Sequence, residues 1–450
     1  MSRISPAVTA LAALCMAGAG ALQAQNRRCQ LQVLNVGRDL VSANVTPTTS
    51  NYFAGGDIRM RCRGQNVYIW ADSVANYQDQ VVQFIGHFRY QDETARVTSD
   101  FGTYYKDREL WEARGNVVYQ SRSDASKLTG PSVDYMRPIR GTRELEEIFA
   151  DQRPTLVLAS RDSASRAEEP YIVVADRIRM RGKELMWAGG NVTIDRSDLN
   201  GRSDSLQLDT GKGNTGALIA KAGRASIRRV ASDSFVLAGK RIDLGLSKRE
   251  LTSVTGRDSA TLKSKDLDLL SESIALMFVA RKVAQTLAWG KALRPKALSA
   301  DYEVRGDSMA VDTPAEQLKE LRSFRGAWVG FKADSTRGER DWLSGDKITA
   351  VFTQRTTGTG QAKSALERIE AKESARSFYR LPGTATTGGR PTINYARADL
   401  ITLTMEPGDS VKVRKVDMVG HIDGVQLQPE SVRRDTLRPD SAAVRPRPRP

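Results

Sequence analysis

Apolar and polar residues alternate along most of the chain, and this period of two predicts β-strands that bury one face. Successive side chains of a strand point to opposite faces, so every second residue shares a side. In the run from Val81 to Gln91, one face takes Val82, Phe84, Phe88 and Tyr90. The same alternation pairs Val192 with Ile194, Leu206 with Leu208, Ile242 with Leu244 and Ile401 with Leu403. Each run is too short to be stable alone, so neighbouring strands must complete the core.

The strands belong to a repeated unit. A unit opens with a small or acidic residue and an alternating strand, passes a polar turn, and closes with an apolar strand that runs into glycine and a small or polar residue. Units start at Ala71, Ser99, Ala175, Ser203, Gly239, Ser271 and Gly306, and consecutive starts within 71–99 and within 175–306 are 28 to 36 residues apart. Polar turns such as the one at 106–108 separate the strands, which predicts successive antiparallel hairpins. A continuous parallel coil is the alternative.

The expected fold is therefore all-β: an elongated, antiparallel β-jellyroll or solenoid-like repeat array, either continuous or in two blocks. The segment Leu267–Leu287 has the length and residue types of a helix. Its ends match the repeat, so we expect two strands around Ala280–Lys282 instead. The segment Arg140–Arg153 has helical spacing in its apolar residues, and residues 161–170 are polar and rich in alanine. Together these two segments suggest an insertion or linker.

The first residues have the features of a secretory signal peptide. Arg3 precedes an apolar run from Val8 to Ala21, with a suitable cleavage position after Ala24. A permanent membrane anchor is the weaker interpretation, because the run is short and polar residues follow at once. The expected layout is a signal peptide (1–24), an N-terminal β-repeat block (25–138), an insertion or linker (139–170), a main β-repeat array (171–429) and a disordered basic Pro/Arg tail (430–450).

Composition and charge limit the classes of possible partner but do not identify one. Aromatic residues make up 6% of the chain, charged residues 27%, and the mean hydropathy is −0.43, so the apolar residues must be spread over a thin core. The formal net charge is +15, but lysine and arginine are scattered along the chain and form no cluster with aromatic residues. We therefore expect no nucleic-acid partner. Diffuse positive charge suits phosphorylated glycolipids or anionic membrane surfaces, or else a solvated surface without a specific partner.

Few residues are available for chemistry. Cys29 and Cys62 remain after removal of the leader, and we expect them to form a disulfide; two buried free thiols are the alternative. His87 and His421 each stand alone, so we expect no metal site and no cofactor. No nucleophile-elbow, zinc-protease or P-loop motif occurs, and we expect no enzyme activity. A carboxylate pair of the glycosidase kind is the alternative that the sequence leaves open.

The repeat signatures resemble those of a known family. The closing segments are GHFRY (86–90), LWEARGNVVYQ (110–120), LMWAGGNVTIDR (185–196), TLAWGKALRP (286–295) and VDMVGHIDGVQLQP (416–429). The openings ADS, ADR, SDS and GDS at Ala71, Ala175, Ser203 and Gly306 agree with them. These segments resemble the repeats of the OstA-like, organic-solvent-tolerance family, which includes LptA, LptC and the periplasmic domain of LptD. The resemblance extends from about Gly55 to Pro429, although the chain is longer than the small bridging members.

What this resemblance implies is an open β-jellyroll whose apolar inner face binds lipid acyl chains. The implied function is lipopolysaccharide or related glycolipid transport through the periplasm toward the outer membrane, with other Lpt-like β-jellyrolls docked edge to edge. The implied location is the periplasm, free or associated with the outer membrane. The groove candidates are Val82, Phe84, Phe88, Tyr90, Val192, Ile194, Leu206 and Leu208; an ordinary core role is the alternative for each. The competing function is a structural or adhesive envelope β-solenoid that transfers no lipid.

Overall fold

The computed structural model confirms the all-β fold. It describes residues 28–38, 40–159, 169–230, 234–248, 250–331, 340–356, 362–381, 390–406 and 413–429. These residues form strands β1 to β30 and one short 3-10 helix, and their described pairings are antiparallel. The expected signal peptide and basic tail lie outside the described residues.

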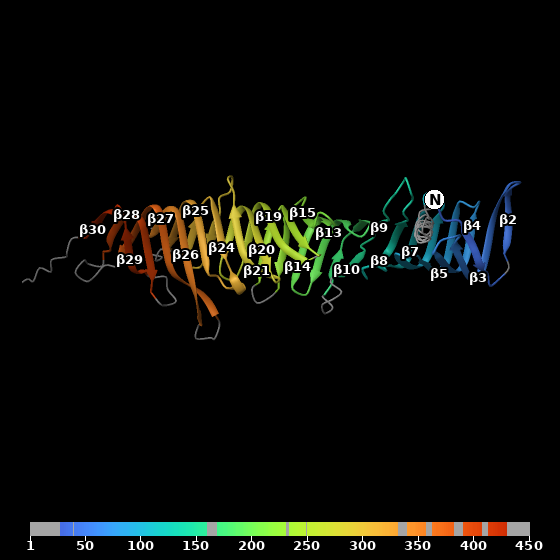
Figure 1. Ribbon diagram of the computed structural model, residues 1–450, viewed down its shortest axis with the longest axis horizontal. Coiled ribbons are helices and arrows are strands. Elements are labelled where there is room, and N and C mark those ends of the chain that lie inside the picture. The colour runs from blue at the N-terminus through green and yellow to red at the C-terminus, as the bar shows by residue number, and fades with distance from the viewer. Residues whose placement is uncertain are drawn as a thin grey trace, which may run out of the picture. The chain divides into compact units, whose positions relative to one another are not determined.

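The chain divides into two compact units. Unit 1 comprises Met1–Pro295 and Ala310–Gln317; unit 2 comprises Lys296–Met309 and Leu318–Pro450. The division therefore falls at a different place from the expected linker at 139–170, which lies within unit 1. Figure 1 labels the strands by their order in the chain.

The bounds of the elements in unit 1 are β1 (Leu31–Asn35), β2 (Val41–Thr46), β3 (Thr49–Cys62), β4 (Tyr68–Tyr77), β5 (Val81–Gln91), β6 (Ala95–Tyr105), β7 (Leu110–Ser121), β8 (Lys127–Met136), β9 (Glu147–Asp151), β10 (Thr155–Leu158), β11 (Tyr171–Val174), β12 (Arg177–Arg181), β13 (Leu185–Arg196), β14 (Leu199–Asp209), β15 (Thr215–Ile219), β16 (Ala225–Arg229), β17 (Phe235–Gly239), β18 (Arg241–Ser247), β19 (Glu250–Lys263), β20 (Asp268–Val279), β21 (Lys282–Trp289) and the 3-10 helix η1 (Pro314–Glu316). Strand β24 (Ser308–Asp312) contains the boundary between the units. Unit 2 holds β22 (Lys296–Leu298), β23 (Tyr302–Arg305), β25 (Glu320–Phe331), β26 (Trp342–Thr356), β27 (Ala362–Leu381), β28 (Thr392–Met405), β29 (Val413–Val419) and β30 (Asp423–Leu427).

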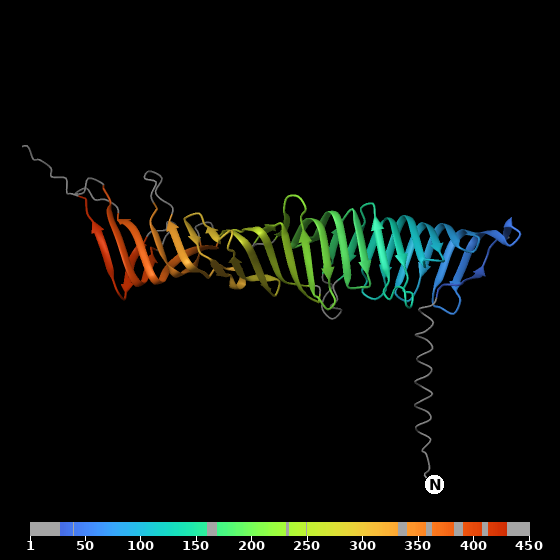
Figure 2. The same cartoon turned by 90° about the horizontal axis from the view of Figure 1, so that it is seen from above.

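Long strands of unit 1 bend at a two-residue corner and so take part in two hydrogen-bonded ladders. In β5, residues 81–85 pair with residues 73–77 of β4, and residues 89–91 pair with residues 68–70. We call the ladder that contains residues 81–85 ladder A and the one that contains residues 88–91 ladder B. Ladder A continues through β9 and β12, and ladder B through β10 and β11. Figure 2 shows consecutive strands of unit 1 following one another in chain order.

The corners explain the opening and closing signatures of the repeat. At the β5 corner, Gly86 has φ = 78° and His87 has φ = 44°, a region that side chains rarely adopt. The His87 ring nitrogen Nδ1 lies 2.8 Å from Oδ2 of Asp72, the acid of the ADS opening. A Cβ atom on Gly86 would lie 2.2 Å from the same oxygen, so only glycine fits there. The closing glycine and the opening acid are thus partners across adjacent strands.

The same corner recurs along unit 1 and also in unit 2. Each instance joins an amide or imidazole that follows the glycine to an acid on, or directly before, a neighbouring strand. The further pairs are Asn116–Asp100 (2.8 Å), Asn191–Asp176 (3.0 Å) and, in unit 2, His421–Asp399 (2.9 Å). Both histidines of the chain therefore serve as corner residues beside one carboxylate.

Two segments whose sequence patterns resembled helices contain strands in the structure. The expected pair of strands in Leu267–Leu287 is confirmed: β20 and β21 pair with each other around a turn at Ala280 and Arg281, both with positive φ. The helical spacing in Arg140–Arg153 is misleading, because residues 147–151 form β9. Ile148 and Ala150 are buried in β9 while Phe149 is 37% exposed, so the period of two prevails there. β9 and the next strand, β10, each pair with β8 and so continue both ladders through the expected linker at 139–170.

Candidate functional site

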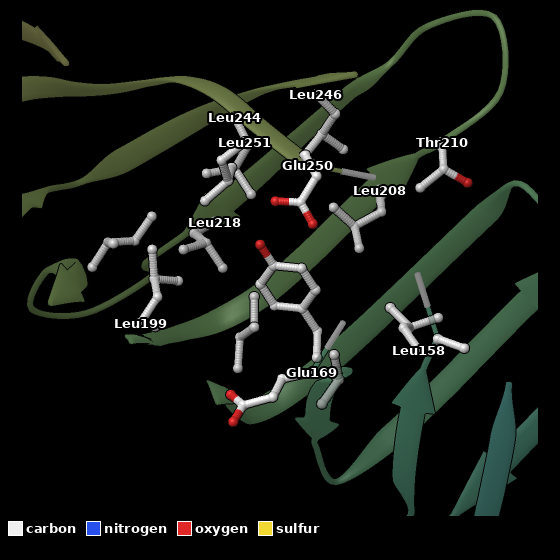
Figure 3. A pocket seen from close by; sticks show the side chains of 16 residues that line it. Leu158, Glu169, Leu199, Leu208, Thr210, Leu218, Leu244, Leu246, Glu250 and Leu251 are labelled. Atoms are coloured by element: carbon white, nitrogen blue, oxygen red, sulfur yellow. The ribbon is translucent and has the colours of Figure 1, made fainter. Parts of the chain in front are cut away.

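Unit 1 holds an apolar cavity between ladders A and B, in the stretch from β10 to β19. Its empty space, counted out to the solvent at its mouth, is about 750 Å³. Strands of both ladders contribute to its wall, and Figure 3 shows leucine side chains from several strands around the space. The wall residues are Leu158, Ala159, Glu169, Tyr171, Val173, Ile194, Leu199, Gly201, Leu208, Thr210, Leu218, Ile227, Leu244, Leu246, Glu250 and Leu251.

The cavity exists because the interior side chains in this stretch are small or aliphatic. Gly201 occupies an inward position of β14, and a Cβ atom there would have only ordinary contacts, at 3.5 Å from Ile194 and 3.6 Å from Leu218. Among the described wall residues, Tyr171 alone is aromatic. Aliphatic side chains that leave space unfilled present an apolar surface without hydrogen-bonding groups, which suits hydrocarbon rather than polar ligands.

The buried arginine next to the cavity wall has carboxylate partners. The Arg196 side chain is 6% exposed, and its guanidinium carbon lies 4.5 Å from the centre of the Tyr171 ring. Arg196 pairs with Asp198 at 2.5 Å and with Glu250 at 3.4 Å, and Arg281 pairs with Glu250 at 3.2 Å. Burial raises the pKa of the Tyr171 phenol to about 12, so it stays protonated at neutral pH. The carboxylate of the wall residue Glu250 thus has two cationic partners.

The stretch that precedes the cavity has the same two ladders but a filled interior. We call residues 28–137 the closed block. Its centre is Trp111, which is 2% exposed and has ring-centroid distances of 4.3 Å to Tyr104, 4.8 Å to Tyr90, 6.0 Å to Phe84 and 6.3 Å to Phe88. These rings come from both ladders, so they fill the space that is open between β10 and β19.

A set of buried polar contacts, which we call the clasp, also joins the two ladders of the closed block. Cys29 and Cys62 form a disulfide with a Cα–Cα distance of 5.0 Å. Tyr104 donates hydrogen bonds to Glu109 (2.9 Å) and to the Cys29 carbonyl (3.3 Å). Arg137 lies 3.5 Å from Glu109, and their side chains are 6% and 1% exposed. Cys62 ends β3 in ladder B, whereas Glu109 lies at the turn before β7 in ladder A, so the clasp links the free ends of both.

The groove candidates from the sequence separate into two sets. Ile194 and Leu208 are in the cavity wall. Val192 and Leu206 are 1% and 0% exposed and lie in the core of the same strands, β13 and β14. The four earlier candidates pack inside the closed block at 0–3% exposure; they are Val82, Phe84, Phe88 and Tyr90.

Sequence reasoning did not single out most of the cavity wall. The wall leucines that were not groove candidates are Leu158, Leu199, Leu218, Leu244, Leu246 and Leu251, of which alternation had placed only Leu244, on one face with Ile242. A signal was present: interior positions that are aromatic around Trp111 are mostly aliphatic or glycine between β10 and β19, with Phe235 as a buried exception. Alternation alone marks inward residues, but only side-chain size distinguishes a filled interior from an open one.

Other site types are not found in the part of the chain that the structure describes. No helix there has the length and apolar character to cross a bilayer. The described His, Cys, Asp and Glu side chains do not gather in groups of three that could hold a metal ion.

Comparison with known proteins gives a likeness in structure but none in sequence. No protein-family profile matches the chain, and no curated protein matches it by sequence. Among solved structures, the chain is similar to LptH of Pseudomonas aeruginosa, described as the LptA-homologous periplasmic component of the lipopolysaccharide transport device. The sequence identity is 15% and the TM-score is 0.25; the match covers 29% of this chain and 94% of LptH.

Proposed function

We propose that the protein is a periplasmic carrier that binds the acyl chains of lipopolysaccharide or a related glycolipid in the cavity of unit 1. The observation that carries this proposal is the wall of mostly aliphatic side chains that both ladders present to one cavity. The resemblance of the repeat signatures to the OstA-like family supports the choice of ligand.

The physical chemistry of the wall favours hydrocarbon chains. Each methylene that leaves water for an apolar site contributes about 0.8 kcal/mol, so a few carbons of an acyl chain give useful affinity. Of the two carboxylates in the wall, Glu250 has Arg196 and Arg281 as partners and Glu169 is exposed to solvent, so neither presents an unpaired buried charge to an acyl chain. The closed block offers no comparable space around Trp111, so we place the acyl chains in the stretch from β10 to β19.

Transfer also requires partners, and exposed strand edges support them. In the described part of unit 1, β2 pairs with β3 alone, and all of its residues are exposed. In the described part of unit 2, β30 pairs with β28 alone, with Val425 and Leu427 59% and 60% exposed. Unpaired edges with apolar side chains favour the addition of another strand. We therefore propose docking with other Lpt-like β-jellyrolls at these edges.

A photo-crosslinking residue in place of Leu208 tests the proposal directly. After purification from an envelope extract, we expect glycolipid adducts at position 208, detected by mass spectrometry. Position 84 in the closed block and the outward position 83 serve as controls and should give none. Protein adducts without lipid at all three positions would instead favour the structural or adhesive β-solenoid.

A space-filling variant tests the same cavity without crosslinking. Gly201→Leu should place its side chain into the cavity, since a Cβ atom at this position meets nothing closer than 3.5 Å. Loss of room for about two methylenes should weaken glycolipid binding by roughly tenfold. Gly55→Leu in the closed block is the matched control, because its Cβ meets only Ser73, at 3.6 Å. Equal glycolipid binding by both variants would mean that the ligand does not bind in this cavity.

A further inference from the structure

A second hollow lies on the outer side of the corners in the closed block, away from the apolar cavity. Its empty space, including the part open to solvent, is about 970 Å³. Its wall is polar and carries both signs of charge, unlike the aliphatic wall between the ladders. The residues that line it are Asp57, Trp70, Ala71, Asp72, His87, Phe88, Arg89, Arg96, Thr98, Ser99, Asp100 and Asn116.

One side of this corner hollow has two arginines that lack an acidic partner. The guanidinium carbon of Arg89 lies 4.2 Å from the centre of the Trp70 ring, and Trp70 stacks on Tyr68 at 6.0 Å. Arg89 Nε is buried and has no hydrogen-bond partner in the described structure. Neither Arg89 nor Arg96 forms an ion pair with a described carboxylate. Stacking fixes Arg89 in place and leaves its donors for an oxyanion.

The other side of the corner hollow is a row of carboxylates that are already oriented. Oδ2 of Asp72 is 2.8 Å from His87, and Oδ2 of Asp100 accepts a hydrogen bond from Asn116 at 2.8 Å. Among the described residues, Oδ1 of both acids has no hydrogen-bond partner. Asp57, which pairs with Arg59, extends the row to β3. From β3 to β6 the row spans three strand spacings, or roughly 14 Å.

We propose that the corner hollow binds an anionic saccharide, with its phosphate or carboxylate on Arg89 and Arg96 and its hydroxyl groups on the aspartates. The arginines and aspartates line one space without pairing across it, so a ligand with an oxyanion and several hydroxyl donors satisfies both sides. A single ammonium group could not meet acceptors spread along the row. A peptide strand has no place here, because β4, β5 and β6 each already pair on both sides.

An array of neutral, carboxylated, sulfated and phosphorylated oligosaccharides tests this proposal on the whole mature protein. We expect retention of anionic glycans above neutral ones. Arg96→Gln should weaken the retained binding by about tenfold or more, because a charge-assisted hydrogen bond is lost. Arg89→Lys, which keeps the charge but not the planar fork, should also weaken it. Arg228→Gln, at an exposed position on β16, is the matched control for non-specific attraction to a basic protein and should bind as the wild type does.

Calorimetry with maltose 1-phosphate, maltose and inorganic phosphate then distinguishes the contribution of the phosphate to binding from that of the sugar hydroxyl groups. Asp100→Asn should weaken binding of maltose 1-phosphate but not of inorganic phosphate, because only the sugar donates hydrogen bonds to the acid. A digalacturonate arm distinguishes a carboxylate from a phosphate as the oxyanion. Equal retention of neutral and anionic glycans, unchanged binding by Arg96→Gln and Arg89→Lys, or inorganic phosphate that binds as tightly as every glycan would each overturn the proposal.

Discussion

The closed block and the cavity stretch of unit 1 have the same backbone plan and opposite interiors. Both have strands in ladders A and B, although many strands of the cavity stretch, such as β15 and β16, are short and enter one ladder each. Around Trp111, aromatic rings from the two ladders fill the space between them, whereas between β10 and β19 leucines leave a cavity. The corner chemistry therefore sets the repeat, and the size of the inward side chains decides whether a repeat is solid or hollow.

The polar contacts at the free ends of the ladders also differ between the closed block and the cavity stretch. The clasp holds those ends together in the closed block through the Cys29–Cys62 disulfide and the buried pair Glu109–Arg137. Beside the cavity, Arg196 is as buried as Arg137, at 6% exposure, but its partners Asp198 and Glu250 are 33% and 28% exposed, against 1% for Glu109. A block that is filled and clasped is suited to give stability, and a block that is hollow is suited to bind.

Truncation of the central aromatic residue should produce the largest effect. Trp111→Ala removes a buried side chain that contacts four rings, and we expect a loss of about 4 kcal/mol in the free energy of unfolding. Leu208→Ala, in the cavity wall, should cost roughly 1–2 kcal/mol, because that side chain is already partly unpacked. Guanidinium denaturation followed by far-UV circular dichroism measures both. Similar losses would contradict the distinction between a solid and a hollow interior.

Removal of the disulfide should have the next largest effect. The bond joins residues 33 positions apart, and the double variant Cys29→Ser, Cys62→Ser should lose about 3 kcal/mol of stability. The same variant should still give glycolipid adducts at position 208, because the cavity wall lies outside the clasp. Loss of those adducts in a protein that remains folded would show that the two stretches are coupled.

The sequence predicted the strands well because alternation directly encodes which face is buried. It predicted β20 and β21 correctly despite their helical composition, since their ends match the repeat. It misplaced the residues around β9, where Leu145, Ile148 and Phe149 have helical spacing but only Ile148 is buried. Leu145 is 46% exposed, so its spacing to Ile148 does not reflect a shared buried face.

The cavity was harder to predict because it depends on contacts between distant strands. Ile194 and Leu208 were found by alternation, yet alternation equally selects Phe84 and Phe88, which lie against Trp111. Whether an inward residue can contact a ligand or instead packs against an aromatic ring depends on which side chain faces it from the opposite ladder. The partners of the glycine corners, such as Asp72 and His87, were visible as signatures, but their pairing required the register of β4 and β5.

The smallest effect that we predict concerns a carboxylate on β18, within the cavity stretch. Asp243 is 28% exposed, and although partial burial raises its pKa, hydrogen bonds from Arg257 and Arg241 outweigh that and hold the pKa below its usual value. A lowered pKa in the folded state stabilises the protein above the unfolded-state pKa of about 4, and this stabilisation is lost as the pH falls through the folded pKa.

Asp243→Asn should therefore cost stability at pH 7, by only about 0.5–1 kcal/mol because water screens a partly exposed ion pair. The cost should become smaller as the pH is lowered below about 4, because the carboxylate is then protonated and no longer attracts the arginines. Urea denaturation at pH 7 and at pH 3 measures the two differences. Asp268→Asn, at an exposed position without a described ion pair, is the control and should show no such dependence. A loss at low pH as large as that at pH 7 would mean that Asp243 acts through packing rather than charge. Stability beside the cavity would then rest on the same kind of contact as in the closed block.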